Sequence, residues 1–135
     1  MLRFLPYSAG RYASNPQSKA VSFMRELKRG HEDLLHRRGN YLVRRLRLAP
    51  GEATAWHRDP FQRISVVVSG DTLAIEFRDG SPTQPWIPTA GEVNWLEPSD
   101  QVHRAVNIGS KVFEEVTTFF LDRPDAVPQP EAEES

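Results

Sequence analysis

Short runs in which apolar and polar residues alternate occupy most of this chain, and turn-forming residues separate them. In TLAIEFRD, residues 72–79, every second residue is apolar from Leu73 onward, while Glu76 takes the opposite face. A period of two is typical of a strand with one face in a core. The run RISVVVS, residues 63–69, is apolar at nearly every position. It therefore predicts a strand that is buried on both faces.

Further short runs follow as far as residue 122, each bounded by glycine, proline, aspartate or serine. They cover residues 86–88, 92–97, 101–109 and 112–122. The turns recur at about 8–12 residues, and about seven or eight strands at that spacing indicate a sandwich or a barrel. The predicted fold class is therefore all-β.

The period is different before residue 30. Ser14-Asn15-Pro16 has the form of a helix start, with a capping residue followed by proline near the first turn. Residues 19–29, KAVSFMRELKR, carry apolar side chains at helical spacing. We expect a short amphipathic helix that ends near Gly30 and packs on the outside of the domain. Binding of a partner by this helix is the alternative.

The arginine-rich segment 33–51 predicts a hairpin with its turn at 38–40. Leu42 shares one expected face with Leu46, and Arg45 lies on the other. We therefore divide the chain into an N-terminal arm with its helix, a β-barrel domain and a disordered, acidic, proline-rich tail, over residues 1–39, 40–122 and 123–135.

Composition narrows the class of protein. The chain has 135 residues, 39% of them apolar and 26% charged, which suits one globular domain. The formal net charge is −1, and aromatic residues do not interleave with the arginines, so nucleic-acid binding is not expected. Because there is no cysteine, any metal ligands must be nitrogen and oxygen atoms.

The chain also offers no signal for a membrane or for export. The first residues lack an apolar run of the length that a secretory signal needs. No window approaches the roughly 18 apolar residues of a spanning helix. We therefore expect a cytoplasmic protein that does not associate with membranes.

The candidate chemistry centres on His57, Asp59 and His103. On a strand, residues two apart point to the same face, so His57 and Asp59 are expected to project together. A barrel can bring the distant His103 beside them. Two imidazoles and one carboxylate on one face of a metal leave positions open for substrate or oxygen, as in non-haem iron oxygenases. Zinc, manganese and nickel can bind the same ligands.

The spacing around these residues resembles the first motif of small single-domain cupins. That motif runs Pro-Gly, five residues, His-x-His, three or four residues, Glu, six residues, Gly. Here Pro50-Gly51 precedes His57 by five residues, and Arg63 and Gly70 follow at the expected intervals. Two residue types differ from the family, because Asp59 replaces the second His and Arg63 replaces the Glu.

A second cupin motif runs Gly, five residues, Pro-x-Gly, two residues, His, three residues, Asn. Here six residues separate Gly91 from Pro98, and Asp100 replaces the Gly, but His103 and Asn107 fall at the expected intervals. The resemblance covers roughly residues 40–122. It implies a double-stranded β-helix, the cupin jelly-roll barrel, with one divalent metal held by His57, Asp59 and His103. Iron is the first choice of metal. Because many cupins pair by exchanging strands, a homodimer is expected as well.

Arg63 is the main departure from the family, because a guanidinium stays protonated and cannot ligate a metal. It could point into the cavity and bind a carboxylate or phosphate of the substrate with its two-pronged donor geometry. It could instead pair with Asp59, so that an internal ion pair replaces the metal. In a third arrangement it faces solvent.

Other residues complete the hypothesis. We expect Trp56 and Trp95 to help hold an organic ligand, Asn107 to satisfy backbone groups at a turn, and three acidic residues to face solvent, namely Glu76, Glu114 and Glu115. The predicted function is a metal-dependent enzyme that acts on a small, anionic organic molecule, with dioxygenase-like or Lewis-acid chemistry. The alternative is a metal-free cupin that binds a small ligand without catalysis. No residue identifies a catalytic group beyond the metal ligands.

Overall fold

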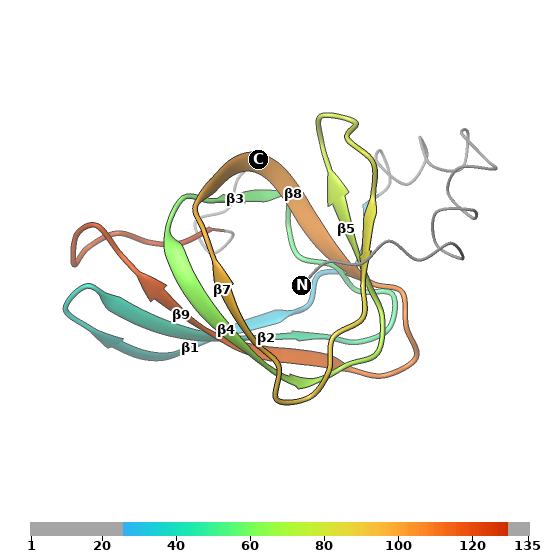
Figure 1. Cartoon of the computed structure of the whole chain (residues 1–135), viewed down its shortest axis with the longest axis horizontal. Coiled ribbons are helices and arrows are strands. Elements are labelled where there is room, and N and C mark those ends of the chain that lie inside the picture. Colours follow the sequence, from blue (N-terminus) through green and yellow to red (C-terminus); the bar gives the residue numbers. More distant parts are fainter. Residues whose placement is uncertain (1–25, 130–135) are drawn as a thin grey trace.

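The computed structural model describes residues 26–129, which form nine strands in two antiparallel sheets that curve around a shared interior (Figure 1). The five-stranded sheet has the order β1-β2-β9-β4-β7, with bounds His31–Arg38, Tyr41–Leu48, Phe113–Phe120, Gln62–Ser69 and Val93–Leu96. The four-stranded sheet has the order β3-β8-β5-β6, with bounds His57–Asp59, Ser99–Asn107, Leu73–Phe77 and Gln84–Trp86. The predicted all-β class is confirmed.

Two apolar clusters form the core between these sheets. One cluster joins the two sheets and consists of Leu48, Val67, Leu73 and Phe113. The other packs against the residues that follow β9 and consists of Leu42, Phe119, Leu121 and Ala126. Each large side chain buried in this way contributes about 1.5–3 kcal/mol relative to its exposed state. The space between the clusters holds the polar residues described below.

Strand β4 is buried on one face only, so the prediction of burial on both faces was wrong. Ser65 and Val67 are buried, whereas Val66 and Val68 are 39% and 47% exposed. The reason is that β4 lies in an antiparallel sheet, between β9 and β7, whose outer face is open over these two valines.

The predicted hairpin at the start of the barrel is present as β1 and β2. Gly39 occupies its turn with a φ of 56°, a left-handed conformation that glycine adopts without strain. Because β1 begins at His31, the barrel sheet starts before the predicted boundary at residue 40.

The turn role expected for Asn107 is confirmed. Its side-chain amide donates to the carbonyls of Leu48 and Lys111, both at 2.8 Å, and its side-chain oxygen accepts from the backbone N–H of Gly109 at 2.9 Å. All these bonds lie at the end of β8, where the backbone turns toward β9. Asn107 therefore satisfies polar backbone groups at a position that is almost fully buried.

Residues 123–129 pack on the barrel, which differs from the disordered tail expected from their composition. Ala126 and Pro128 are buried. Arg37 donates to the carbonyl of Ala126 at 2.8 Å, and Arg44 donates to those of Pro128 and Gln129 at 3.2 and 2.8 Å. Two arginines on neighbouring strands thus supply the donors that a proline-rich backbone cannot provide for itself. The last predicted tail residues, 130–135, lie outside the described part.

Most of the predicted N-terminal helix also lies outside the described residues. Its last positions, 26–30, contain no helix, and Arg29 pairs with Ala53 in an isolated β-bridge. Within residues 26–129 no helix is both long and apolar enough to cross a membrane.

Candidate metal centre

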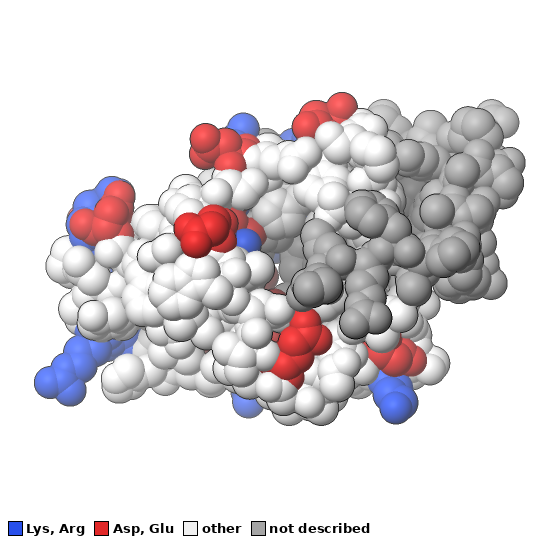
Figure 2. All heavy atoms as spheres, viewed as in Figure 1, with Lys and Arg blue, Asp and Glu red and all other residues white. Residues whose placement is uncertain are grey.

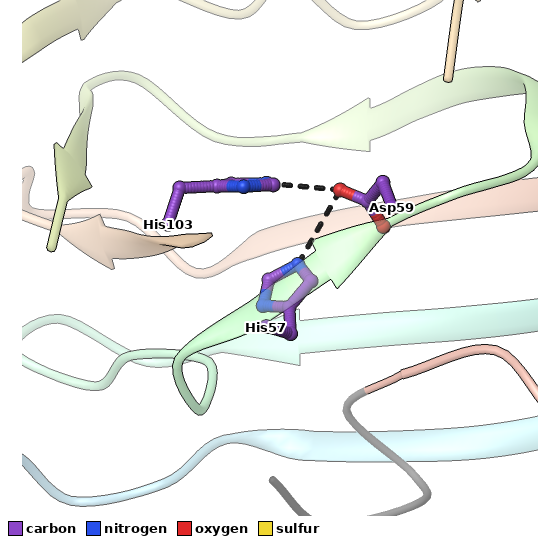
Figure 3. Close-up of side chains that lie close together, drawn as sticks. All are labelled: His57, Asp59 and His103. Carbon is purple, nitrogen blue, oxygen red and sulfur yellow. Dashed lines mark ion pairs between the residues drawn. The ribbon is translucent and has the colours of Figure 1, made fainter. Parts of the chain in front are cut away.

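Strands β3 and β8 bring His57, Asp59 and His103 to one face of the four-stranded sheet. Side chains alternate along β3, so His57 and Asp59 are buried while Arg58 is exposed. His103 stands opposite His57 in the pairing of β3 with β8. Their ring centroids are 4.5 Å apart. The convergence of the three predicted ligands is therefore present in the structure (Figure 3).

The potential ligand atoms of these residues meet at the Asp59 carboxylate. Its Oδ2 lies 2.9 Å from Nε2 of His103 and 3.5 Å from Nε2 of His57. One ligand atom from each of the three residues lies within 4.8 Å of the others. Such a spacing allows all three to contact one ion after small side-chain adjustments.

The other ring nitrogen of each histidine is held by the backbone. Nδ1 of His57 lies 2.7 Å from the carbonyl oxygen of Ala55, and Nδ1 of His103 lies 2.9 Å from that of Gln101. A carbonyl oxygen only accepts, so each Nδ1 carries the donated hydrogen. Nε2 of both rings then faces the Asp59 carboxylate, to which it can donate a hydrogen when no metal is bound. After loss of that proton, its lone pair can bind a metal. Histidine ligands in metal sites are oriented by this kind of outer hydrogen bond.

The pKa values of Asp59 and His103 reflect how closely the candidate ligands are packed together. Burial alone would raise the pKa of Asp59, but hydrogen bonds from His103 and His57 outweigh it and hold that pKa well below its usual range. Burial would lower the pKa of His103, yet its hydrogen bond to Asp59 raises that pKa above the ordinary value. A negative carboxylate between imidazoles attracts either protons or a cation.

Arg63 faces the same carboxylate from β4. Its Nη2 lies 3.3 Å from Oδ2 of Asp59, and its Nη1 donates to the carbonyls of Phe61 and Glu97. The Arg63 side chain is only 13% exposed and lines the cavity. The arrangement in which it faces solvent does not hold. Arg63 pairs with Asp59 and also lines the cavity, so its position is compatible with both of the other predicted arrangements.

The three candidate ligands form part of the wall of a cavity of about 470 Å³. A cavity of this size can enclose a small organic molecule. Its apolar wall comes from both sheets and includes Leu73, Ile75, Phe77, Trp86 and Phe113. Its polar wall lies mainly on the five-stranded sheet, facing the candidate ligands.

Sequence reasoning missed this polar wall. Arg44, Thr117, Ser65 and Asn94 are paired in register across β2, β9, β4 and β7, and all four line the cavity. Glu115 lines it from the next inward position of β9. The available signal was the two-residue period of a strand. Arg44 lies two residues after Leu42, and Ser65 lies two residues before Val67, so each shares the face of an apolar residue expected in the core.

Glu115 was predicted to face solvent, and the structure corrects this. Its position opposite Leu46 and Val67 places it on the inner face of the sheet. Burial, and after it the negative charge of Asp59, raises the pKa of Glu115 to about 7. Among the described residues no basic nitrogen lies within ion-pair distance of it.

The two predicted ligand-binding tryptophans have different outcomes. Trp56 does not line the cavity, because it precedes His57 and points to the opposite face of the sheet. There the guanidinium carbons of Arg104 and Arg78 lie 4.4 and 5.1 Å from its ring centroid. Trp95 contributes to the cavity wall from the edge strand β7 but is 57% exposed. Its ring stacks on that of Phe120, with the two ring centroids 6.0 Å apart.

The face of the four-stranded sheet that points away from the cavity, here called the outer face, also carries a buried ion pair. Nε of Arg104 lies 2.8 Å from Oε1 of Glu76, and the two side chains are 4% and 3% exposed. Glu76 was predicted to face solvent, so this is also a correction. The alternation in β5 was read correctly, but both faces of this strand are covered.

The molecular surface shows no concentration of one charge on the face drawn in Figure 2. Over the described part of this face, basic side chains lie mainly along the edge, and acidic side chains lie both along the edge and nearer the middle. This distribution agrees with the formal net charge of −1.

Comparisons with known proteins identify the fold. No sequence profile of a known family matches this chain, and no curated protein matches it. Solved structures do match. A cupin domain from Bordetella pertussis aligns with a TM-score of 0.62 and 20% identity, over 70% of this chain and 96% of its own.

Two further structures agree with the first. A conserved protein with a double-stranded β-helix domain from Klebsiella pneumoniae aligns with a TM-score of 0.57 and 23% identity, over 73% of this chain and 81% of its own. A cupin 2 conserved barrel domain protein from Salinispora arenicola has a TM-score of 0.53 and 18% identity, over 69% and 76%. The chain therefore has the double-stranded β-helix fold of cupin domains, and the fold expected from the two motifs is confirmed. A fold alone does not specify a function.

Proposed function

We propose, from the cupin fold and the geometry of its interior, that this protein binds one divalent metal ion through His57, Asp59 and His103. The observation that carries the proposal is the convergence of one ligand atom from each residue within 4.8 Å at a cavity wall. In this proposal the metal-bound protein acts on a small, anionic organic molecule held in the cavity.

The donor set fits a metal of intermediate hardness. Two neutral imidazoles and one carboxylate suit iron, zinc, manganese and nickel, and the facial arrangement with open positions is typical of non-haem iron. Both Nδ1 atoms already donate to backbone carbonyls, so both Nε2 atoms are oriented for binding. When bound, the metal would supply Lewis acidity or activation of oxygen. Iron is accordingly our first choice, and dioxygenase-like chemistry our first reaction class.

Arg63 supports an anionic substrate. Its guanidinium lies beside Asp59 and also lines the cavity. A metal bound to Asp59 would compensate that carboxylate's charge and weaken its attraction for Arg63. The guanidinium could then bind a carboxylate of the substrate through two N–H groups. Arg63 thus orients the substrate in our proposal and does not ligate the metal.

A metal-free binding protein is the second candidate. It is favoured by the contacts of Asp59, whose Oδ2 already lies 3.3 Å from Arg63 and 2.9 Å from His103. These cations could replace the metal as permanent partners of the carboxylate. The cavity would then bind an organic ligand without catalysis.

The first experiment is to measure the metal content of the full chain, purified without an affinity tag or chelator, by elemental mass spectrometry. We expect close to one equivalent of metal per chain, or uptake of one equivalent of ferrous iron under anaerobic conditions. No metal and no uptake would contradict the proposal and favour the metal-free protein.

A matched pair of variants assigns the ligand. His103→Ala is expected to bring the metal content close to zero while the circular dichroism spectrum stays that of a folded β-protein. His36→Ala is the control, because His36 is an exposed histidine on β1. Its metal content is expected to equal that of the unaltered protein.

A further inference from the structure

The cavity contains a buried hydroxyl that lacks an ordinary partner. Ser65 is 1% exposed and lines the cavity, and its Oγ makes no hydrogen bond of normal geometry to any described residue. A buried hydroxyl left unpaired costs about 1–3 kcal/mol. Buried polar atoms of this kind usually mark the place of a water molecule or a ligand.

The Glu115 carboxyl faces the same part of the cavity. In the pairing of β4 with β9, Ser65 lies opposite Thr117 and Glu115 lies opposite Val67. Ser65 and Glu115 are therefore diagonal neighbours on the inner face. The Ser65 hydroxyl is close enough to lower the pKa of Glu115 slightly, although the contact does not have the geometry of an ordinary hydrogen bond. Glu115 has no basic partner within ion-pair distance among residues 26–129. Two polar groups with unused hydrogen-bonding capacity thus lie side by side.

Arg63 adds a positively charged group to the same wall of the cavity. It precedes Ser65 by two residues on β4 and shares its inner face, which corresponds to about 6–7 Å along the strand. Moving along β4, the wall therefore presents a guanidinium, then a hydroxyl, then a carboxyl from the neighbouring strand. The facing part of the cavity is apolar and includes Leu73 and Ile75.

We propose that Ser65 and Glu115 form a second polar subsite that binds a hydroxyl group, so that the cavity selects short hydroxycarboxylates. The placement of the ligand carboxylate beside Arg63 rests on the proposed function. A hydroxyl both donates and accepts, so it satisfies the Ser65 hydroxyl and the Glu115 carboxyl together. A methyl group in its place would leave both groups unpaired. The apolar wall contacts the methylene groups between the two ends.

The test compares matched ligands that differ only in a terminal hydroxyl. The pairs are 3-hydroxypropanoate with propanoate, 4-hydroxybutanoate with butanoate, and 5-hydroxypentanoate with pentanoate. Binding to the full chain is measured by ligand-observed NMR, with and without added Co²⁺. In at least one pair we expect the hydroxylated acid to bind about 5- to 10-fold more tightly, the factor that one hydrogen bond contributes. Equal affinities in every pair, or no binding of any hydroxylated acid, would overturn the proposal.

Variants connect the preference to the two side chains. Ser65→Ala and Glu115→Met are each expected to reduce the preference to less than about 2-fold, whereas Ser65→Thr, which retains a hydroxyl, is expected to retain part of it. Thr118→Ala is the control, because Thr118 lies on β9 with the opposite orientation to Thr117. An unchanged preference in both Ser65→Ala and Glu115→Met would contradict the assignment of the subsite.

Two further outcomes separate this inference from the proposed function. If 4-aminobutanoate binds more tightly than 4-hydroxybutanoate, the subsite is an ammonium site and the hydroxyl proposal is wrong. If the protein binds Co²⁺ but does not distinguish the paired acids, the subsite fails and the metal site stands. If the hydroxyl preference is present in a protein that takes up no metal, the subsite stands and the metal site fails.

Discussion

Asp59 and Glu76 are both buried carboxylates of the four-stranded sheet, and they lie on its two opposite faces. Asp59 faces the cavity and contacts His57, His103 and Arg63 at 2.9–3.5 Å. Glu76 faces away from the cavity and contacts Arg104 at 2.8 Å. Adjacent residues of β8, His103 and Arg104, supply one partner to each carboxylate.

The two carboxylates differ in whether a metal ion could replace the proton on their partner side chains. Glu76 is matched by a guanidinium, which is always protonated and cannot ligate a metal. Asp59 is matched mainly by imidazoles, which can lose a proton and bind a metal in its place. The cavity wall also leaves Ser65 and Glu115 incompletely paired. The outer pair therefore offers no site for a metal, whereas the inner-face groups are the ones that bind ligands in our proposal.

Removal of a histidine ligand gives the largest expected contrast between the two faces. His103→Ala should lower metal affinity by more than about 100-fold, since one of three protein ligands is lost. Titration with Co²⁺, followed by its visible absorption, measures this affinity. Arg104→Leu provides the comparison and should leave the affinity within about 2-fold. Equal losses in the two variants would show that the faces do not differ in this way.

The outer pair should dominate stability. Arg104→Ala leaves the Glu76 carboxylate buried without its guanidinium, and breaking a buried pair costs about 3–5 kcal/mol. Urea unfolding of the metal-free protein measures this loss. The double replacement of Arg104 by Leu and Glu76 by Leu should recover most of it. If Arg104→Ala unfolds at the same urea concentration as the unaltered protein, the outer pair has no structural role.

Glu115 predicts a dependence of the free energy of unfolding on pH. Its pKa is raised to about 7 in the folded state, from about 4.3 when unfolded. The folded state therefore binds the proton more tightly, and stability falls as pH rises from about 4.5 to 7. The loss levels off above about pH 7 and amounts to at most about 4 kcal/mol, at roughly 1.4 kcal/mol per pKa unit.

Glu115→Gln tests this dependence, because the amide has the same shape and does not titrate. In urea unfolding of metal-free protein, the variant should match the unaltered protein at pH 4.5 and exceed its stability at pH 8. The opposite sign, with the variant less stable at pH 8, would mean that the ionised carboxylate is stabilised by its surroundings.

Ser65→Ala should have the smallest effect. Removal of a buried hydroxyl without an ordinary hydrogen bond leaves stability unchanged or raises it by about 1 kcal/mol. A stabilising replacement at a cavity wall is typical of a residue retained for binding. Thermal unfolding measures the change, and a clear loss of stability would show that the hydroxyl already has a structural partner.

Much of the fold could be predicted from the sequence, because it depends on periods and turns that are local. Alternating apolar residues indicated the strands, and the two motifs placed His57, Asp59 and His103 in register. The turn role of Asn107 was also predicted. Each of these conclusions depends on spacing along one chain segment or on a motif of known form.

Only the tertiary structure decided which faces are covered and which polar groups meet. Alternation placed Glu76 on one face of its strand, and the continuous apolar run predicted burial for Val66. Whether either face is covered depends on distant segments. The inward position of Glu115 and Ser65 follows from pairing with strands far away in the chain. Local periodicity determines that two sides exist, whereas burial and charge matching arise from contacts between segments. For this reason the candidate ligands were visible in the sequence, and the polar wall that faces them became visible only when the barrel closed.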